Sequence, residues 1–112
     1  MSPITTHVLD VSRGRPASGV PVRLSVEEAG EWKLLSEKAT DSDGRVKDLM
    51  AEGALKTGTY RLEFALTEYF RAQSVEAFYP AAAITFVVKN ASEHHHVPLL
   101  LSPFGYSTYR GS

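Results

Sequence analysis

Turn-forming residues interrupt this 112-residue chain about every ten positions, and this spacing constrains the fold more than any other feature. The runs between the interruptions are short and rich in β-branched and aromatic residues, a composition typical of strands. In the clearest runs apolar and polar residues alternate, which gives a strand one buried and one exposed face. The expected strands are residues 4–10, 20–27, 32–39, 58–66, 83–89, 94–101 and 104–110.

One short helix is expected at residues 67–73. Thr67 can cap its start, Glu68 lies in its first turn, and neither Gly nor Pro interrupts the segment. Residues 12–16 and 40–44 are expected to be turns, the second because it combines two aspartates with a glycine. Arg45 directly follows that second turn, which would hold its guanidinium at a fixed place on the rim of the fold.

An alternating sheet needs a cover for its apolar side, so the pattern predicts two sheets packed face to face. We therefore expect an all-β sandwich of seven to eight strands with one short helix, formed by residues 1–112 as a single domain. The segment 97–101 is apolar on both faces of its strand. One face belongs in the core, and a second subunit is the expected cover for the other.

Composition excludes several classes of function. The chain has no cysteine, which rules out disulfides, thiol nucleophiles and thiolate metal sites. Its net charge is −1, with 12 basic and 13 acidic residues, so no charge pattern for binding nucleic acid is present. No apolar run is long enough for a membrane span, and the first residues do not form a secretory signal. We expect a cytoplasmic protein that binds neither nucleic acid nor membrane.

Histidines are the candidates for chemistry. His94 and His96 fall on one face of their expected strand and His95 on the other. His7 lies in the first strand, and Arg45 follows its turn. Each has a plainer interpretation: His7 and Arg45 as solvated surface residues, and the histidine triplet as a polar strand start or a metal site. Spacing alone leaves these alternatives open, although it offers a metal few ligands on one face.

Motifs spread along the whole chain form a more specific signal. They are Ile4-Thr-Thr-His-Val-Leu-Asp10, Gly19-Val-Pro-Val22, Thr40-Asp-Ser-Asp-Gly-Arg45, Tyr60-Arg-Leu62, Phe78-Tyr-Pro80, the His-x-His-Val-Pro-Leu-Leu-Leu-Ser-Pro block and the final Tyr109-Arg-Gly-Ser112. Together they resemble the hydroxyisourate-hydrolase branch of the transthyretin-like family. The final tetrapeptide is the most specific of them, and hormone carriers of that family lack both it and the matching histidines. One departure is visible, because His95 occupies a position that is usually Tyr in this family.

The resemblance implies a transthyretin-like fold and hydrolysis of 5-hydroxyisourate, a small ureide, to 2-oxo-4-hydroxy-4-carboxy-5-ureidoimidazoline in urate degradation. It implies no metal and no organic cofactor. It also implies a homotetramer of two edge-to-edge dimers, with the sites in the groove where the dimers meet. The catalytic residues that it implies are His7, Arg45, His96 and Ser112, and the substrate-binding residues are His94, Tyr109, Arg110 and Gly111.

Two other functions are compatible with the chain. A carrier of the same fold would hold a small aromatic ligand in the central groove, although apolar ligands favour aliphatic walls over histidines. A metal-binding module would use the segment 94–96 and would lose its structure or activity with a chelator.

Overall fold

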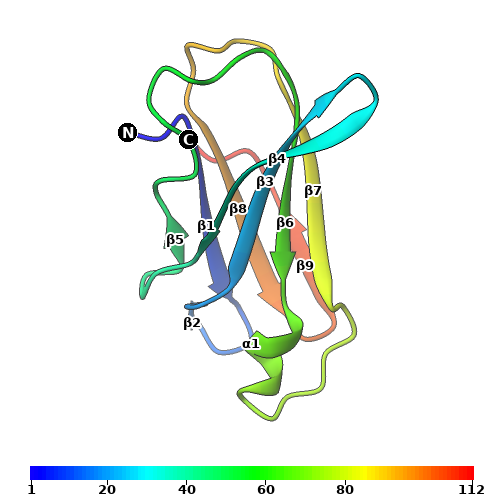
Figure 1. The fold of residues 1–112 in the computed structure, drawn as a ribbon. Coiled ribbons are helices and arrows are strands. Elements are labelled where there is room, and N and C mark those ends of the chain that lie inside the picture. The colour runs from blue at the N-terminus through cyan, green and yellow to red at the C-terminus, as the bar shows by residue number, and fades with distance from the viewer.

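The computed structural model describes residues 1–112 as two β-sheets packed face to face (Figure 1). One sheet has the order β2-β1-β8-β9, and a short strand β5 also pairs with β1. Its strands are β1 (Ile4–Asp10), β2 (Arg15–Pro16), β5 (Arg45–Val46), β8 (His95–Ser102) and β9 (Gly105–Thr108). The other sheet has the order β4-β3-β6-β7, with β3 (Pro21–Glu28), β4 (Glu31–Ala39), β6 (Gly58–Ala65) and β7 (Ala81–Val88). The predicted β-sandwich is confirmed.

Strand register in the first sheet brings distant parts of the sequence together. β1 and β8 run parallel, with Thr5 opposite His96 and His7 opposite Pro98. On the other side of β1, the antiparallel β5 sets Arg45 opposite His7. One row across three strands therefore contains Arg45, His7 and Pro98. His96 lies two rows away, opposite Thr5, and so on the same face of the sheet as His7.

The core lies between the sheets and follows from the alternation in the sequence. In β1 every second side chain, from Ile4 to Asp10, is buried, and the side chains between them are half-buried. Nineteen buried apolar residues form one continuous cluster. Full burial of a Val, Leu or Phe side chain contributes roughly 1.5–3 kcal/mol, so this cluster is the main source of stability.

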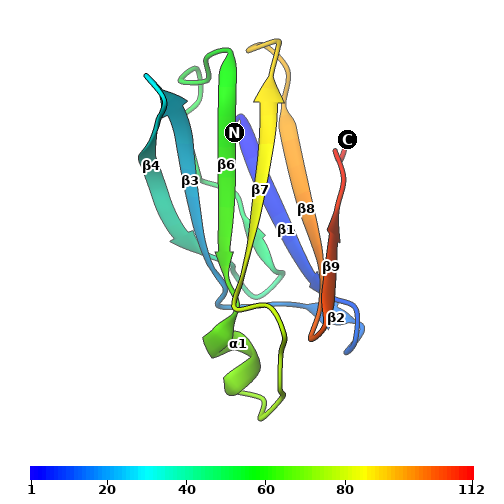
Figure 2. The ribbon, with the colours of Figure 1, turned by 90° about the vertical axis from the view of Figure 1, so that its right-hand side faces the viewer.

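The helix α1 (Thr67–Arg71) lies at one end of the sandwich, and both chain ends lie at the other (Figure 2). Phe70 is buried, and the Tyr69 hydroxyl donates to Oδ2 of Asp10 over 2.7 Å, which ties the helix to the end of β1. This five-residue helix is far too short and polar to cross a membrane. The expected Thr67 cap is wrong: Leu66 stands at the N-cap, and the Thr67 hydroxyl lies 3.5 Å from the carbonyl oxygen of Pro80.

Several element boundaries differ from the prediction. The expected turn at 12–16 contains the two-residue strand β2, and Arg45 belongs to the two-residue strand β5. Both were missed because a strand of two residues has too few positions to show alternation. The helix ends at Arg71, and His94 lies just before β8. The total is nine strands, two of which are these short pieces.

The outer face of β8 is partly covered by the chain itself. Pro98 is buried and Leu100 is half-buried, whereas Val97, Leu99 and Leu101 face the core. A partner subunit over this face remains a prediction.

Candidate active site

Two histidines and one arginine share the outer face of the first sheet. His7 and Arg45 are cross-strand neighbours, and both are half-buried. His96 is paired with Thr5 across the two strands. Thr5 is two residues before His7, so His96 lies on the same face as His7. From strand spacing and rise, the Cα atoms of His7 and His96 are on the order of 8 Å apart, which lets two imidazoles reach one small ligand.

The turn before Arg45 is held in a single conformation. Oδ1 of Asp41 accepts the backbone N–H of Asp43 at 2.9 Å and that of Arg45 at 3.0 Å. Gly44 has φ +76°, and its carbonyl accepts the N–H of Val8 over 2.7 Å. A Cβ on Gly44 would overlap the carbonyl oxygen of Val8. The turn packs closely against β1, and this contact explains how Arg45 is held in the fixed place that the sequence predicts.

Thr5 links His94, which precedes β8, to His96, the second residue of that strand. Its Oγ1 lies 2.9 Å from Nε2 of His94 and 2.8 Å from Nδ1 of His96. The two rings are nearly parallel, with an interplanar angle of 17°. As expected, His94 and His96 share one side of the strand, while His95 is buried on the other.

Burial and neighbouring charge both favour the neutral form of these imidazoles. Burial lowers the pKa of His7 below its ordinary value of 6.5, and the Arg45 guanidinium lowers it further. The pKa of His96 is lowered by burial first, then by Arg45, then by His94 and His7. At neutral pH both His7 and His96 can therefore accept a proton.

Gly111 lies directly against His96. The Gly111 N–H donates to the carbonyl of His96 over 2.8 Å, which makes an isolated antiparallel bridge. A Cβ on Gly111 would stand 2.5 Å from Cδ2 of His96 and 3.3 Å from Cγ of Pro98. Glycine is required here by the close approach of His96 and Pro98, which leave no room for a side chain.

The other C-terminal residues meet the histidines in a cavity and make no hydrogen bond to them. Tyr109 and Arg110 line a cavity of about 250 Å³ between β7 and the β8–β9 pair, with His95, His96 and Phe86 among its other walls. Arg110 forms an exposed ion pair with Glu93 at 3.3 Å. Ser112 follows Gly111 and is exposed.

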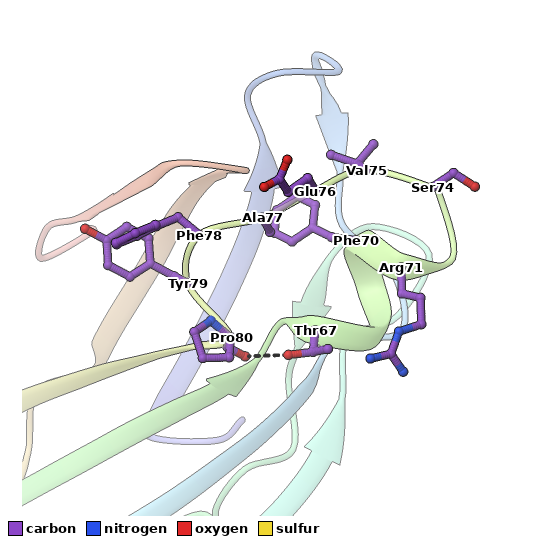
Figure 3. A pocket seen from close by; sticks show the side chains of 10 residues that line it. All are labelled: Thr67, Phe70, Arg71, Ser74, Val75, Glu76, Ala77, Phe78, Tyr79 and Pro80. Carbon is purple, nitrogen blue, oxygen red and sulfur yellow. Dashed lines mark hydrogen bonds between the residues drawn. The ribbon is translucent and has the colours of Figure 1, made fainter.

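Other cavities lie away from this face. One of about 590 Å³ lies beside α1 and the loop that follows it, lined in part by Phe70, Phe78 and Tyr79 (Figure 3). It contains no histidine. No group of three or more His, Cys, Asp or Glu side chains is arranged to hold a metal ion.

Thr5 is the site residue whose contacts sequence analysis missed. Thr5 is two residues before His7 and so lies on the same face of β1, but only the parallel pairing of β1 with β8 brings it to His94 and His96. That pairing joins segments about ninety residues apart, and no local pattern in the sequence reports it.

The arrangement suits attack of water on an amide-type carbonyl. Two neutral imidazoles can take a proton from water, and a guanidinium beside them can stabilise negative charge on oxygen. All three groups are half-buried, where charges interact more strongly than in bulk water.

The fold and this site define a known class. The sequence profile of the HIUase/Transthyretin family matches residues 4–111, and the chain belongs to that family. The 5-hydroxyisourate hydrolase of Caulobacter vibrioides is 47% identical, with 100% of both chains covered. The solved 5-hydroxyisourate hydrolase of Klebsiella pneumoniae is 37% identical with a TM-score of 0.83, covering 97% of this chain and 98% of that one. Sea bream transthyretin, solved in complex with thyroxine, is 32% identical with a TM-score of 0.92, covering 97% of this chain and 94% of that one. The family resemblance and the transthyretin-like fold predicted from the sequence are confirmed.

Proposed function

We propose that this protein is a 5-hydroxyisourate hydrolase, which opens the ring of its substrate in urate degradation. The observation that carries the proposal is the convergence of His7, Arg45 and His96 on one half-buried face. Relatives that bear this enzyme's name cover the whole chain at up to 47% identity.

A carrier function is the alternative, and the fold does not decide against it. The backbone superposes on a thyroxine-bound transthyretin even better than on a hydrolase, with TM-scores of 0.92 and 0.83. The side chains favour the enzyme, because carriers of apolar ligands need aliphatic walls where this chain has histidines and an arginine.

The proposed reaction is attack of water on an amide-type ring carbonyl. A histidine, His7 or His96, takes a proton from the water as its oxygen bonds to the carbonyl carbon. The ring C–N bond then breaks, and the nitrogen receives that proton. The lowered pKa values of both histidines support this role, because a base must be neutral before it can act.

Arg45 has two roles in this proposal. Its guanidinium stabilises the charge that develops on the carbonyl oxygen, and its planar fork matches neighbouring oxygens of the ureide. It also keeps the adjacent His7 neutral by charge repulsion.

We assign the remaining predicted residues to substrate binding and closure of the site. His94 contacts the substrate, and the segment of Tyr109, Arg110 and Gly111 shapes the pocket wall. Ser112 hydrogen-bonds the substrate or the water. The contact between Gly111 and His96 supports this assignment, since it brings the end of the segment to the imidazole.

The active form is proposed to be a homotetramer of two edge-to-edge dimers, with each site in the groove between dimers. The open edges of β7 and β9 support edge-to-edge pairing, because both strands end their sheets with unpaired backbone groups. Neither a metal nor an organic cofactor enters the proposed chemistry. A single domain over residues 1–112 and a cytoplasmic location remain predictions.

A direct assay tests the proposal. 5-Hydroxyisourate is generated from urate with urate oxidase, and its ultraviolet decay is followed with and without this protein. Faster decay, insensitive to a chelator, supports the hydrolase. Saturable binding of the ureide or of thyroxine without faster decay would support the carrier. Loss of the effect after chelation would support a metal site.

A further inference from the structure

The Thr5 hydroxyl lies between two imidazole nitrogens at hydrogen-bond distance. Oγ1 is 2.9 Å from Nε2 of His94 and 2.8 Å from Nδ1 of His96. Both distances are within the usual range for hydrogen bonds, and the two rings are nearly parallel, with an interplanar angle of 17°. No other side chain hydrogen-bonds to either ring.

A hydroxyl has one proton, so it can donate to only one of these nitrogens. If Thr5 donates to His94, it accepts from His96, and His96 must then have its proton on Nδ1. If Thr5 donates to His96, the proton of a neutral His96 is on Nε2. The two histidine tautomers are therefore linked through one oxygen atom.

Only the first arrangement leaves Nε2 of His96 with a free lone pair. Nε2 makes no hydrogen bond within the protein, so it is the ring nitrogen available to a water or substrate. When it accepts a proton, the Nδ1–H bond to Thr5 is unchanged and nothing needs to rearrange. In the second arrangement Nε2 already has a proton and is a donor, not a base.

The surroundings of the rings favour the first arrangement. His94 is exposed, so water can satisfy whichever of its nitrogens Thr5 does not. His96 is half-buried and lies close to Arg45 and His7. In that position the favourable arrangement of the imidazole has its lone pair toward the ligand and its N–H toward a neutral acceptor, the Thr5 hydroxyl.

We propose that Thr5 is a positioning residue that donates to His94 and accepts from His96, and so holds the proton of His96 on Nδ1 and the lone pair of Nε2 toward the substrate. The catalytic role in this inference rests on the proposed hydrolase function. It assigns the proton acceptor among the two histidines to His96, with His7 orienting the substrate.

Three variants test the proposal. Thr5→Val keeps the shape and removes the hydroxyl, Thr5→Ser keeps the hydroxyl, and Thr59→Val makes the same change on β6, where the side chain makes no hydrogen bond. Groups that orient an imidazole typically contribute about 10–100-fold at metal sites, and we expect a loss of that size in kcat for Thr5→Val. KM should change little, Thr5→Ser should recover most of the rate, and Thr59→Val should match the wild type.

Nitrogen-15 NMR of the histidine rings gives a readout that needs no substrate. Above the pKa of His96, the wild type should show a protonated Nδ1 and an unprotonated Nε2 on that ring. Thr5→Val should increase the population with the proton on Nε2, and Thr5→Ser should not. A wild-type His96 protonated on Nε2 would overturn the inference, even if Thr5→Val failed to fold. A wild type with no hydrolase activity would instead refute the proposed function, and the spectrum would still report the tautomer.

Discussion

At the scale of single residues, the proposed chemistry depends on two imidazoles that stay neutral while open to a ligand. His7 and His96 are half-buried, which disfavours their charged forms, and Arg45 adds charge repulsion. Full burial would lower the pKa more but would close the rings to substrate. A half-buried position on the outer face of the sheet satisfies both requirements.

Arg45 variants test this electrostatic role. The lowered pKa values predict that kcat/KM for hydroxyisourate stays high as the pH falls to 6.5 and declines only below it, because the base is lost when it is protonated. Arg45→Gln should move this acid limb to higher pH and reduce kcat/KM by about 10²–10³-fold. Arg45→Lys retains the charge, so its acid limb should stay in place. An unmoved limb in Arg45→Gln would show that the guanidinium does not set the histidine pKa.

At the scale of elements, short connections and close approaches place the functional groups. β5 has two residues, yet it fixes Arg45 because the preceding turn is pressed against β1. The last residues reach His96 because Gly111 adds no side chain at their contact.

Gly44→Ala tests the turn. The new methyl group would meet the carbonyl oxygen of Val8 while φ remains at +76°, so we expect a loss of about 2–4 kcal/mol in the free energy of unfolding. Gly53→Ala is the matched control, since Gly53 has φ +83° with open space around it and should lose only about 1–2 kcal/mol. Urea denaturation measures both. Equal losses would mean that the contact with Val8 does not constrain the turn.

Gly111→Ala tests the contact with His96. The added methyl group would stand 2.5 Å from Cδ2 of His96, so the ring must move, and kcat/KM should fall at least tenfold while the melting temperature changes little. Gly105→Ala meets only Oγ of Ser102, at 3.8 Å, and should behave as the wild type in the same assay. Full activity in Gly111→Ala would place the C-terminal segment outside the catalytic machinery.

Sequence patterns predicted the long strands well because alternation needs only local information. Residues 4–10 match β1 at both ends, and the strand at 58–66 differs from β6 by one residue. Patterns could not predict β2 and β5, which exist only because β1 offers them an edge. The same limit hid the contact of Thr5 with His94 and His96, since it depends on the pairing of two distant strands.

At the scale of the whole molecule, the same sandwich serves as a scaffold for different functions. This chain superposes closely on both a thyroxine-bound transthyretin and a hydrolase, so the backbone fold alone does not decide the function and the side chains must. That face has half-buried residues and belongs to the sheet that ends in the open strand β9, and β7 is an open edge of the other sheet. Association of subunits would cover both the sheet face and the open strand edges.

Sedimentation equilibrium tests the assembly. We expect a species of four times the 12.3 kDa mass of the chain at micromolar concentration, because edge pairing and face packing together bury the exposed backbone and the outer face. A monomer that retains full activity would show that each site is complete within one chain.

Kinetics of a double variant test most directly whether His7 and His96 act as one chemical unit. We would measure kcat/KM for hydroxyisourate hydrolysis with the wild type, His7→Asn, His96→Asn and the combined variant, all confirmed to be folded. Each single change should remove about 10²–10⁴-fold, and the combined variant should be nearly no worse than the poorer single variant, because groups that serve one step fail together. Full activity in either single variant, or losses that multiply in the combined one, would contradict a shared site on this sheet face.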